Sequence, residues 1–164
     1  NHCHQKDIHG LHIRKELLPE KKGVFRVQPH YSDKVFLLKL YPGIEPSILG
    51  LLQKQGYQGV YIEGFGLGGM PFLKHDFASA VRKAVEDGMT VLAGSQCPYE
   101  GSNLSVYETG LLALRGGVLQ AYDMTAEAAV TKLMWVLGQT DKPEEIRDYF
   151  QTNLVREVTI PQGD

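Results

Sequence analysis

The feature that most constrains the fold of this chain is an alternation of short apolar runs with stretches in which apolar residues recur at helical spacing. Each run has the length of a buried strand, and each following stretch is long enough to carry the chain back across a sheet. The runs lie at residues 35–41, 59–63, 90–94 and 117–119. Since crossovers of this length join parallel strands, we predict a small doubly wound α/β domain with about four parallel strands and helices on both faces.

Five helices are expected after these strands, and some of their ends carry recognisable signals. Asp123 or Thr125 can cap the fourth helix, and Gly138 can end it. Pro143 suits the first turn of the fifth helix. The apolar positions expected to face the core are Ile44, Ile48, Leu51 and Leu52; Phe77, Val81, Ala84 and Val85; Leu104, Tyr107, Leu111 and Leu114; Ala129, Leu133, Val136 and Leu137; and Ile146, Phe150 and Leu154.

The length of 164 residues fits one domain. Residues 34–158 contain the whole alternating pattern, and we assign them to that domain. Residues 1–33 contain most of the histidines and only short apolar patches, so we interpret them as a linker or arm. Residues 159–164 are interpreted as a tail.

Composition narrows the classes of function. Lys and Arg number 17 against 19 Asp and Glu, and the resulting net charge of −2 lacks the positive field of a nucleic-acid binder. No apolar run approaches the roughly 20 residues of a membrane helix, and no secretory signal is visible. The chain has two cysteines, Cys3 and Cys97, which favours a reducing compartment over a disulfide scaffold. A cytoplasmic location is therefore expected, and the missing initiator Met suggests a trimmed chain.

A glycine-rich loop follows the second predicted strand. Gly64 to Gly69 satisfies the G-x-G-x-x-G pattern, but the dinucleotide fingerprint normally follows the first strand and opens a helix directly. Here Pro71 follows instead. We therefore interpret the segment as a loop at the carboxyl edge of the sheet, where glycines let backbone N–H groups approach a small polar ligand. A tight turn without a ligand is the alternative.

Neither a metal site nor a complete catalytic set is predicted. The segment with His2, Cys3, His4, His9 and His12 lacks the separated ligand pairs of structural zinc sites and is interpreted as a solvated arm. A nucleophilic Cys97 would need a histidine base, and no spacing argument pairs it with His75. A packed thiol or a ligand contact is the preferred interpretation of that cysteine.

Several segments, taken in this order and spacing, resemble one known family. They are Tyr41–Ile44, Glu63–Pro71, Ser95–Cys97, Tyr107–Gly110 and Asp123–Leu133. Together they resemble the C-terminal domain of type I (cytoplasmic) L-asparaginases. The stretch Lys132–Gly138 is similar to the archaeal-like branch, which includes the D subunit of the tRNA-dependent glutamine amidotransferase. The resemblance covers about residues 34–158.

The resemblance implies a division of labour between two domains. In the family, the threonine nucleophile and its activating residues belong to a larger N-terminal domain, so no catalytic residue is expected in this chain. The smaller domain completes the active site, usually that of a neighbouring subunit. By resemblance, this role falls to Gly64, Gly66 and Gly69 of the glycine loop and to Tyr107. Relatives from the periplasm have Asn at the position of Gly69, so we expect a positioning role here.

The resemblance also implies a possible effector or ligand loop. Some type I members bind a second asparagine beside a Thr-Gln-Cys segment, with an Arg at the end of the strand before the glycine loop. This chain has Ser95, Gln96 and Cys97 in the segment, and Glu63 replaces the Arg. Because a carboxylate cannot clamp another carboxylate as Arg does, the effector site is expected to be absent or altered.

The main functional hypothesis is a C-terminal domain fragment of an L-asparaginase, which converts L-asparagine and water to L-aspartate and ammonia. The expected partners are the N-terminal catalytic domain, L-asparagine and further copies of the same protein, with no cofactor, metal or membrane. The fragment alone is expected to be inactive. A domain of the amidotransferase D subunit is one alternative, and only that alternative implies nucleic acid. A non-catalytic binding or assembly module is another.

Overall fold

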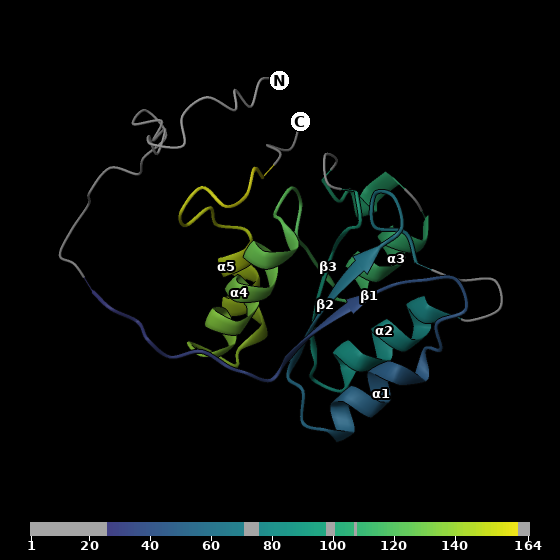
Figure 1. Cartoon of the computed structure of the whole chain (residues 1–164), viewed down its shortest axis with the longest axis horizontal. Helices are drawn as coiled ribbons and strands as arrows, with labels where there is room; N and C mark the ends of the chain where they lie inside the picture. The colour runs from purple at the N-terminus through teal and green to yellow at the C-terminus, as the bar shows by residue number, and fades with distance from the viewer. Residues whose placement is uncertain (1–25, 71–75, 98–100, 107, 161–164) are drawn as a thin grey trace, which may run out of the picture.

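The computed structural model describes residues 26–70, 76–97, 101–106 and 108–160 (Figure 1). Strands and helices alternate through these residues, as the sequence predicts. The elements are β1 (Val35–Lys39), α1 (Ser47–Lys54), β2 (Gly59–Gly64), α2 (Phe77–Glu86), β3 (Thr90–Ser95), the 3₁₀ turn η2 (Leu104–Val106), α3 (Glu108–Arg115), β4 (Leu119–Gln120), α4 (Ala126–Leu137) and α5 (Pro143–Phe150).

The four strands form one parallel sheet in the order β1-β2-β3-β4. This confirms the predicted fold class. The fourth strand is shorter than the predicted 117–119 and begins later, at Leu119. The reason is the end of α3: Gly117 has a φ of +90°, and Val118 donates its backbone N–H to Ala113 at 3.1 Å. These residues terminate the helix, so only the next two can join the sheet.

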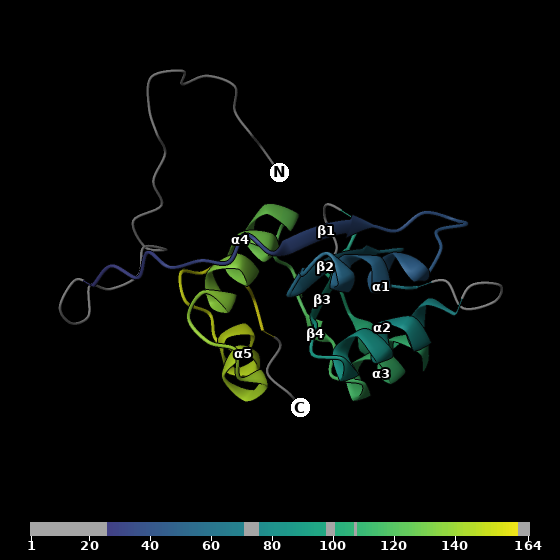
Figure 2. The same ribbon diagram turned by 90° about the horizontal axis from the view of Figure 1, so that it is seen from below.

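Helices cover both faces of the sheet. Figure 2 shows α1, α2 and α3 on one face and α4 with α5 on the other. Along β2, Val60 and Ile62 are buried on the face covered by α1, α2 and α3. Tyr61 is buried on the face covered by α4 and α5. This alternation is the expected consequence of a strand buried on both faces. Gly94 on β3 leaves room for the ring of Tyr61, which a Cβ at that position would meet.

Three predicted core positions are wrong. Leu51 is 55% exposed, and Leu49 is buried in its place. The cause is that α1 begins only at Ser47, so its two turns direct Leu49 and Leu52 inward. Leu111 is exposed on α3, and Leu154 lies beyond the end of α5 and is exposed. Tyr107 lies outside the described residues.

The segment before β1 lies against α4. Ser32 donates its backbone N–H to Met134 O at 2.8 Å, and Trp135 Nε1 donates to Gln28 O at 3.2 Å. Gln139 Nε2 donates to His30 O at 2.6 Å. Three hydrogen bonds, each with a backbone carbonyl as acceptor, therefore hold the described end of the predicted arm against the domain.

A buried ion pair fastens the segment after α5 to the same helix. Lys132 Nζ lies 2.5 Å from Glu157 Oε1 and donates to Thr152 O at 2.9 Å. The side chains of Lys132 and Glu157 are 6% and 10% exposed. Further along, Thr159 donates its backbone N–H to Asp123 Oδ1 at 2.6 Å. The beginning of the predicted tail is thereby held beside the connection between β4 and α4.

Candidate functional site

The glycine loop closes on itself at the carboxyl end of β2. Phe65 donates its N–H to Gly69 O at 2.8 Å, and Phe65 O accepts from Gly68 and Gly69 at 3.0 and 2.7 Å. Three of the N–H groups that could bind a phosphate, those of Phe65, Gly68 and Gly69, are thus already used. The loop also opens no helix, since α2 begins at Phe77. These features match a ligand-edge loop or tight turn and differ from a dinucleotide cradle.

The conformation requires glycine at particular positions of the loop. Gly66 and Gly68 have φ values of +50° and +109°. A Cβ on Gly64 would lie 2.6 Å from the carbonyl carbon of Gly68, and one on Gly68 would lie 2.7 Å from Leu104 Cδ2. At Gly69, φ is outside the left-handed region, and a Cβ would meet Phe65 O at 3.3 Å. Gly68, which the sequence did not single out, is therefore constrained both by its positive φ and by its contact with Leu104.

The segment after β3 braces this loop. Ser95 Oγ donates to Gly66 O and accepts the N–H of Cys97 at 2.8 Å. Gln96 Nε2 donates to Leu40 O at 2.6 Å and to Glu63 O at 3.0 Å. Hence the side-chain hydrogen bonds of Ser95 and Gln96 join the ends of β1, β2 and β3. Their polar atoms are already used in hydrogen bonds within the domain.

The predicted ligand loop lines one cavity of about 450 Å³ at the carboxyl edge of the sheet. Glu63, Ser95, Gln96 and Cys97 all contribute to its wall, which is the convergence expected of parallel strand ends. Its other wall is formed by residues 122–127, the connection from β4 and the first residues of α4, which the sequence analysis identified as a helix cap and as part of the resemblance but did not assign to a site. Since the fourth parallel strand ends at the same edge of the sheet, the residues that follow it could have been predicted to line the cavity.

This second wall has a defined conformation. Tyr122 has a φ of +52°, uncommon outside glycine, and its carbonyl accepts the N–H of Ser102 at 2.6 Å. Thr125 caps α4 by accepting the N–H of Ala128 at 3.3 Å. The expectation that Thr125 or Asp123 caps this helix is confirmed for Thr125.

The cavity is acidic. Glu63, Asp123 and Glu127 line it, and among the described residues of its wall there is no Lys or Arg. The Glu63 side chain is 12% exposed and lies 3.4 Å from Lys39 Nζ. Burial, and after it the carboxylates of Glu63 and Glu127, raises the pKa of Tyr61 to about 12. Such a wall lacks the guanidinium that would clamp a ligand's carboxylate.

The described residues of the cavity do not supply a nucleophile with its base. Cys97 is partly buried, and no histidine stands among the described residues that line the cavity with it. Across the described residues, no group of three His, Cys, Asp or Glu side chains could hold a metal ion. Within the same residues, no helix is long and apolar enough to cross a membrane. The histidines near the N-terminus and His75 lie outside the described part.

Comparison with known proteins identifies relatives over most of the chain. Residues 34–150 match the Glutaminase/Asparaginase C-terminal domain family. The D subunit of the glutamyl-tRNA(Gln) amidotransferase from Metallosphaera sedula is 42% identical over 145 residues, which cover 88% of this chain and 32% of that protein. The thermostable L-asparaginase of Thermococcus kodakarensis has a TM-score of 0.76 at 36% identity, covering 81% of this chain and 40% of that one.

A further solved structure has the same fold. L-asparaginase I of Vibrio cholerae has a TM-score of 0.76 at 30% identity and covers 85% of this chain and 41% of its own. The chain spans about a third of the length of the amidotransferase subunits that it matches.

Proposed function

Because the chain belongs to the Glutaminase/Asparaginase C-terminal domain family, we propose that it is the C-terminal domain of an amidohydrolase that converts L-asparagine and water to L-aspartate and ammonia. The observation that supports a positioning role is the braced glycine loop. Ser95 donates to Gly66 O within the loop and Gln96 donates to Glu63 O directly before it, and the described residues of the adjacent cavity include no nucleophile with a base. Positioning groups lower the barrier only when reactive groups are supplied from elsewhere.

The reactive groups come, in this proposal, from an N-terminal catalytic domain of the same protein. Gly64, Gly66 and Gly69 contribute a wall of fixed shape to its active site, together with Tyr107. Rigidity matters here because a displacement of the wall by about 1 Å can reduce the rate by about 100-fold. We further propose that the protein acts in the cytoplasm as a homo-oligomer.

The second candidate is a domain of an amidotransferase D subunit. Its support is the sequence relatives, which are named as D subunits of glutamyl-tRNA(Gln) amidotransferases and match nearly the whole chain. In both candidates this chain completes an active site whose reactive groups come from polypeptide outside this chain. They differ in whether glutamyl-tRNA is the acceptor of the nitrogen.

The test measures ammonia release from asparagine by this chain, by the separate N-terminal domain and by their mixture, with folding of each checked by circular dichroism. We expect activity in the mixture or the full-length protein and none in this chain. Activity of this chain alone that Cys97→Ala abolishes would contradict the proposal. Amidation of glutamyl-tRNA with poor release of free ammonia would favour the second candidate, and two folded but inert domains would favour an assembly module.

We also propose that the effector site of type I relatives is altered here. Glu63 puts a negative charge where an effector's carboxylate would need a positive one, and Ser95 and Gln96 are already engaged. The full-length enzyme should therefore show a hyperbolic dependence of rate on asparagine concentration. A sigmoidal dependence that Ser95→Ala or Gln96→Ala abolishes would contradict this proposal.

A further inference from the structure

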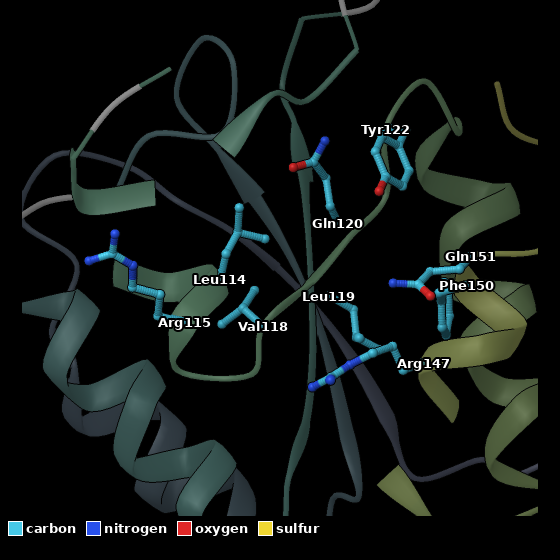
Figure 3. Close-up of a pocket in the computed structure, with 9 residues that line it drawn as sticks. All are labelled: Leu114, Arg115, Val118, Leu119, Gln120, Tyr122, Arg147, Phe150 and Gln151. Atoms are coloured by element: carbon cyan, nitrogen blue, oxygen red, sulfur yellow. The ribbon is translucent and has the colours of Figure 1, made fainter. Parts of the chain in front are cut away.

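β4 forms one edge of the sheet, and no described element pairs with its outer side. A groove of about 330 Å³ lies along this edge between α3 and α5 (Figure 3). Leu114 and Val118 line it on the α3 side, and Leu119 and Phe150 on the α5 side. The groove therefore combines an apolar surface with a strand edge.

The backbone of Gln120 faces this groove. Its neighbour Ala121 donates its N–H to Ala93 O on β3 at 2.8 Å. Because successive residues of a strand direct their backbone groups to opposite sides, the N–H and C=O of Gln120 point away from β3. The side chain of Gln120 leaves them uncovered, since it is bound to Ser102 O at 2.9 Å and to Leu104 N at 3.2 Å. An exposed edge of this kind is a template for another strand.

The groove carries positive charge. Arg115 on α3 and Arg147 on α5 line it, and none of the described residues that line it is a carboxylate. Neither arginine makes an ion pair with any described residue. In Figure 3, Arg147 extends from α5 toward the strand, whereas Arg115 points away from it on the far side of α3. The two charges thus lie apart, one on each face of the sheet.

We propose that the free edge of β4 and this groove bind an extended, acidic segment of a partner protein, which adds to the sheet as a further strand. Successive side chains of an added strand point to opposite faces, so acidic residues on one face would meet Arg147, and Arg115 on the far side of α3 would add to the positive field without direct contact. A single small anion would need both cations at one point. A second copy of this chain fits less well, because antiparallel pairing of β4 with itself would face like charges.

The binding test uses a fluorescein-labelled octapeptide, Val-Val-Glu-Glu-Val-Val-Glu-Glu, and measures fluorescence anisotropy with the chain. We expect it to bind at least about tenfold more tightly than the same peptide with Lys in place of Glu. Arg147→Glu should weaken binding of the acidic peptide by about tenfold or more. Lys54→Glu, which makes the same charge change on α1, is the matched control and should leave affinity within about twofold.

Two N-methylated peptides test whether the segment adds as a strand. Methylation of alternate amides blocks one edge of the peptide, so one set should abolish binding and the other should leave it intact. Equal behaviour of the two sets would overturn the proposal. So would displacement of the peptide by N-acetylglutamate at the same concentration, which would indicate a small-anion site. A dimer in sedimentation that Arg147→Glu dissociates would assign the edge to a second copy instead.

The outcome is independent of the proposed asparaginase function. Arg147 lies on α5 beside the β4 edge and lines a different cavity from that of Glu63 and Ser95. Arg147→Glu should therefore leave asparagine turnover by the full-length protein unchanged while it weakens peptide binding.

Discussion

Removal of the buried carboxylate at Glu157 should produce a pH-dependent loss of stability. Burial raises the pKa of this group, but hydrogen bonds from Lys132 and from the backbone N–H groups of Val155 and Leu154 outweigh burial and lower it to about 2. The difference from the ordinary value of 4.5 corresponds to about 3 kcal/mol of folding free energy at neutral pH. Glu157→Gln should therefore lower the free energy of unfolding by roughly 2–3 kcal/mol at pH 7.

The sign of the pH effect follows from the direction of the shift. Because the carboxyl has the lower pKa in the folded chain, its stabilising contribution is complete above about pH 4.5 and is lost as pH falls toward 2. At pH 3 the stability difference between the original chain and Glu157→Gln should have fallen to about half its value at pH 7.

Urea denaturation provides the measurement. Trp135 is the single tryptophan and packs edge-on against Tyr149 at 5.3 Å between ring centroids, so its fluorescence reports unfolding of this layer. The control is Glu145→Gln, which removes an exposed ion pair with Lys142 and should change stability little. If Glu157→Gln costs the same at pH 7 and pH 3, or no more than the control, the reasoning is refuted.

Further predictions concern the glycine loop and its brace. Gly68→Ala should lower the free energy of unfolding by about 1–3 kcal/mol, because it combines a φ of +109° with a close approach to Leu104. Gly50→Ala on the exposed face of α1, where a Cβ meets nothing within 4 Å, should be neutral or stabilising, and urea denaturation compares the two. Ser95→Ala should lower kcat of the full-length enzyme with little loss of stability, whereas Ser95→Thr should retain activity; equal kcat for both would exclude the brace. Gly69→Asn should retain more asparaginase activity than Gly69→Val, because a β-branched side chain crowds the carbonyl of Phe65 more severely.

The sequence predicted the strands because their burial on both faces leaves a strong signal. Val60, Tyr61 and Ile62 are all buried, so their run is continuously apolar. The family resemblance had grouped Glu63 with Ser95, and their convergence in the structure agrees with the rule that parallel strands end at one edge. In contrast, the predicted burial of Leu51 failed because it depended on where the helix begins, and a helix of two turns has too few residues to fix its phase.

The roles of the polar side chains were harder to predict. Ser95 and Gln96 were interpreted as ligand contacts, yet their donors bind carbonyls of Gly66 and Leu40, which lie far away in the sequence. Lys132 stands among the apolar positions of α4, where periodicity places a core residue but does not reveal that Glu157 will neutralise it. Such pairings depend on tertiary contacts that no local pattern encodes.

α4 explains how the flanking segments and the cavity belong to one structure. The beginning of the helix, at Thr125 and Glu127, walls the acidic cavity, and Lys132 in its middle fastens the segment after α5. Near its end, Trp135 fastens the segment before β1. One helix of 12 residues therefore connects both flanking segments with the cavity wall.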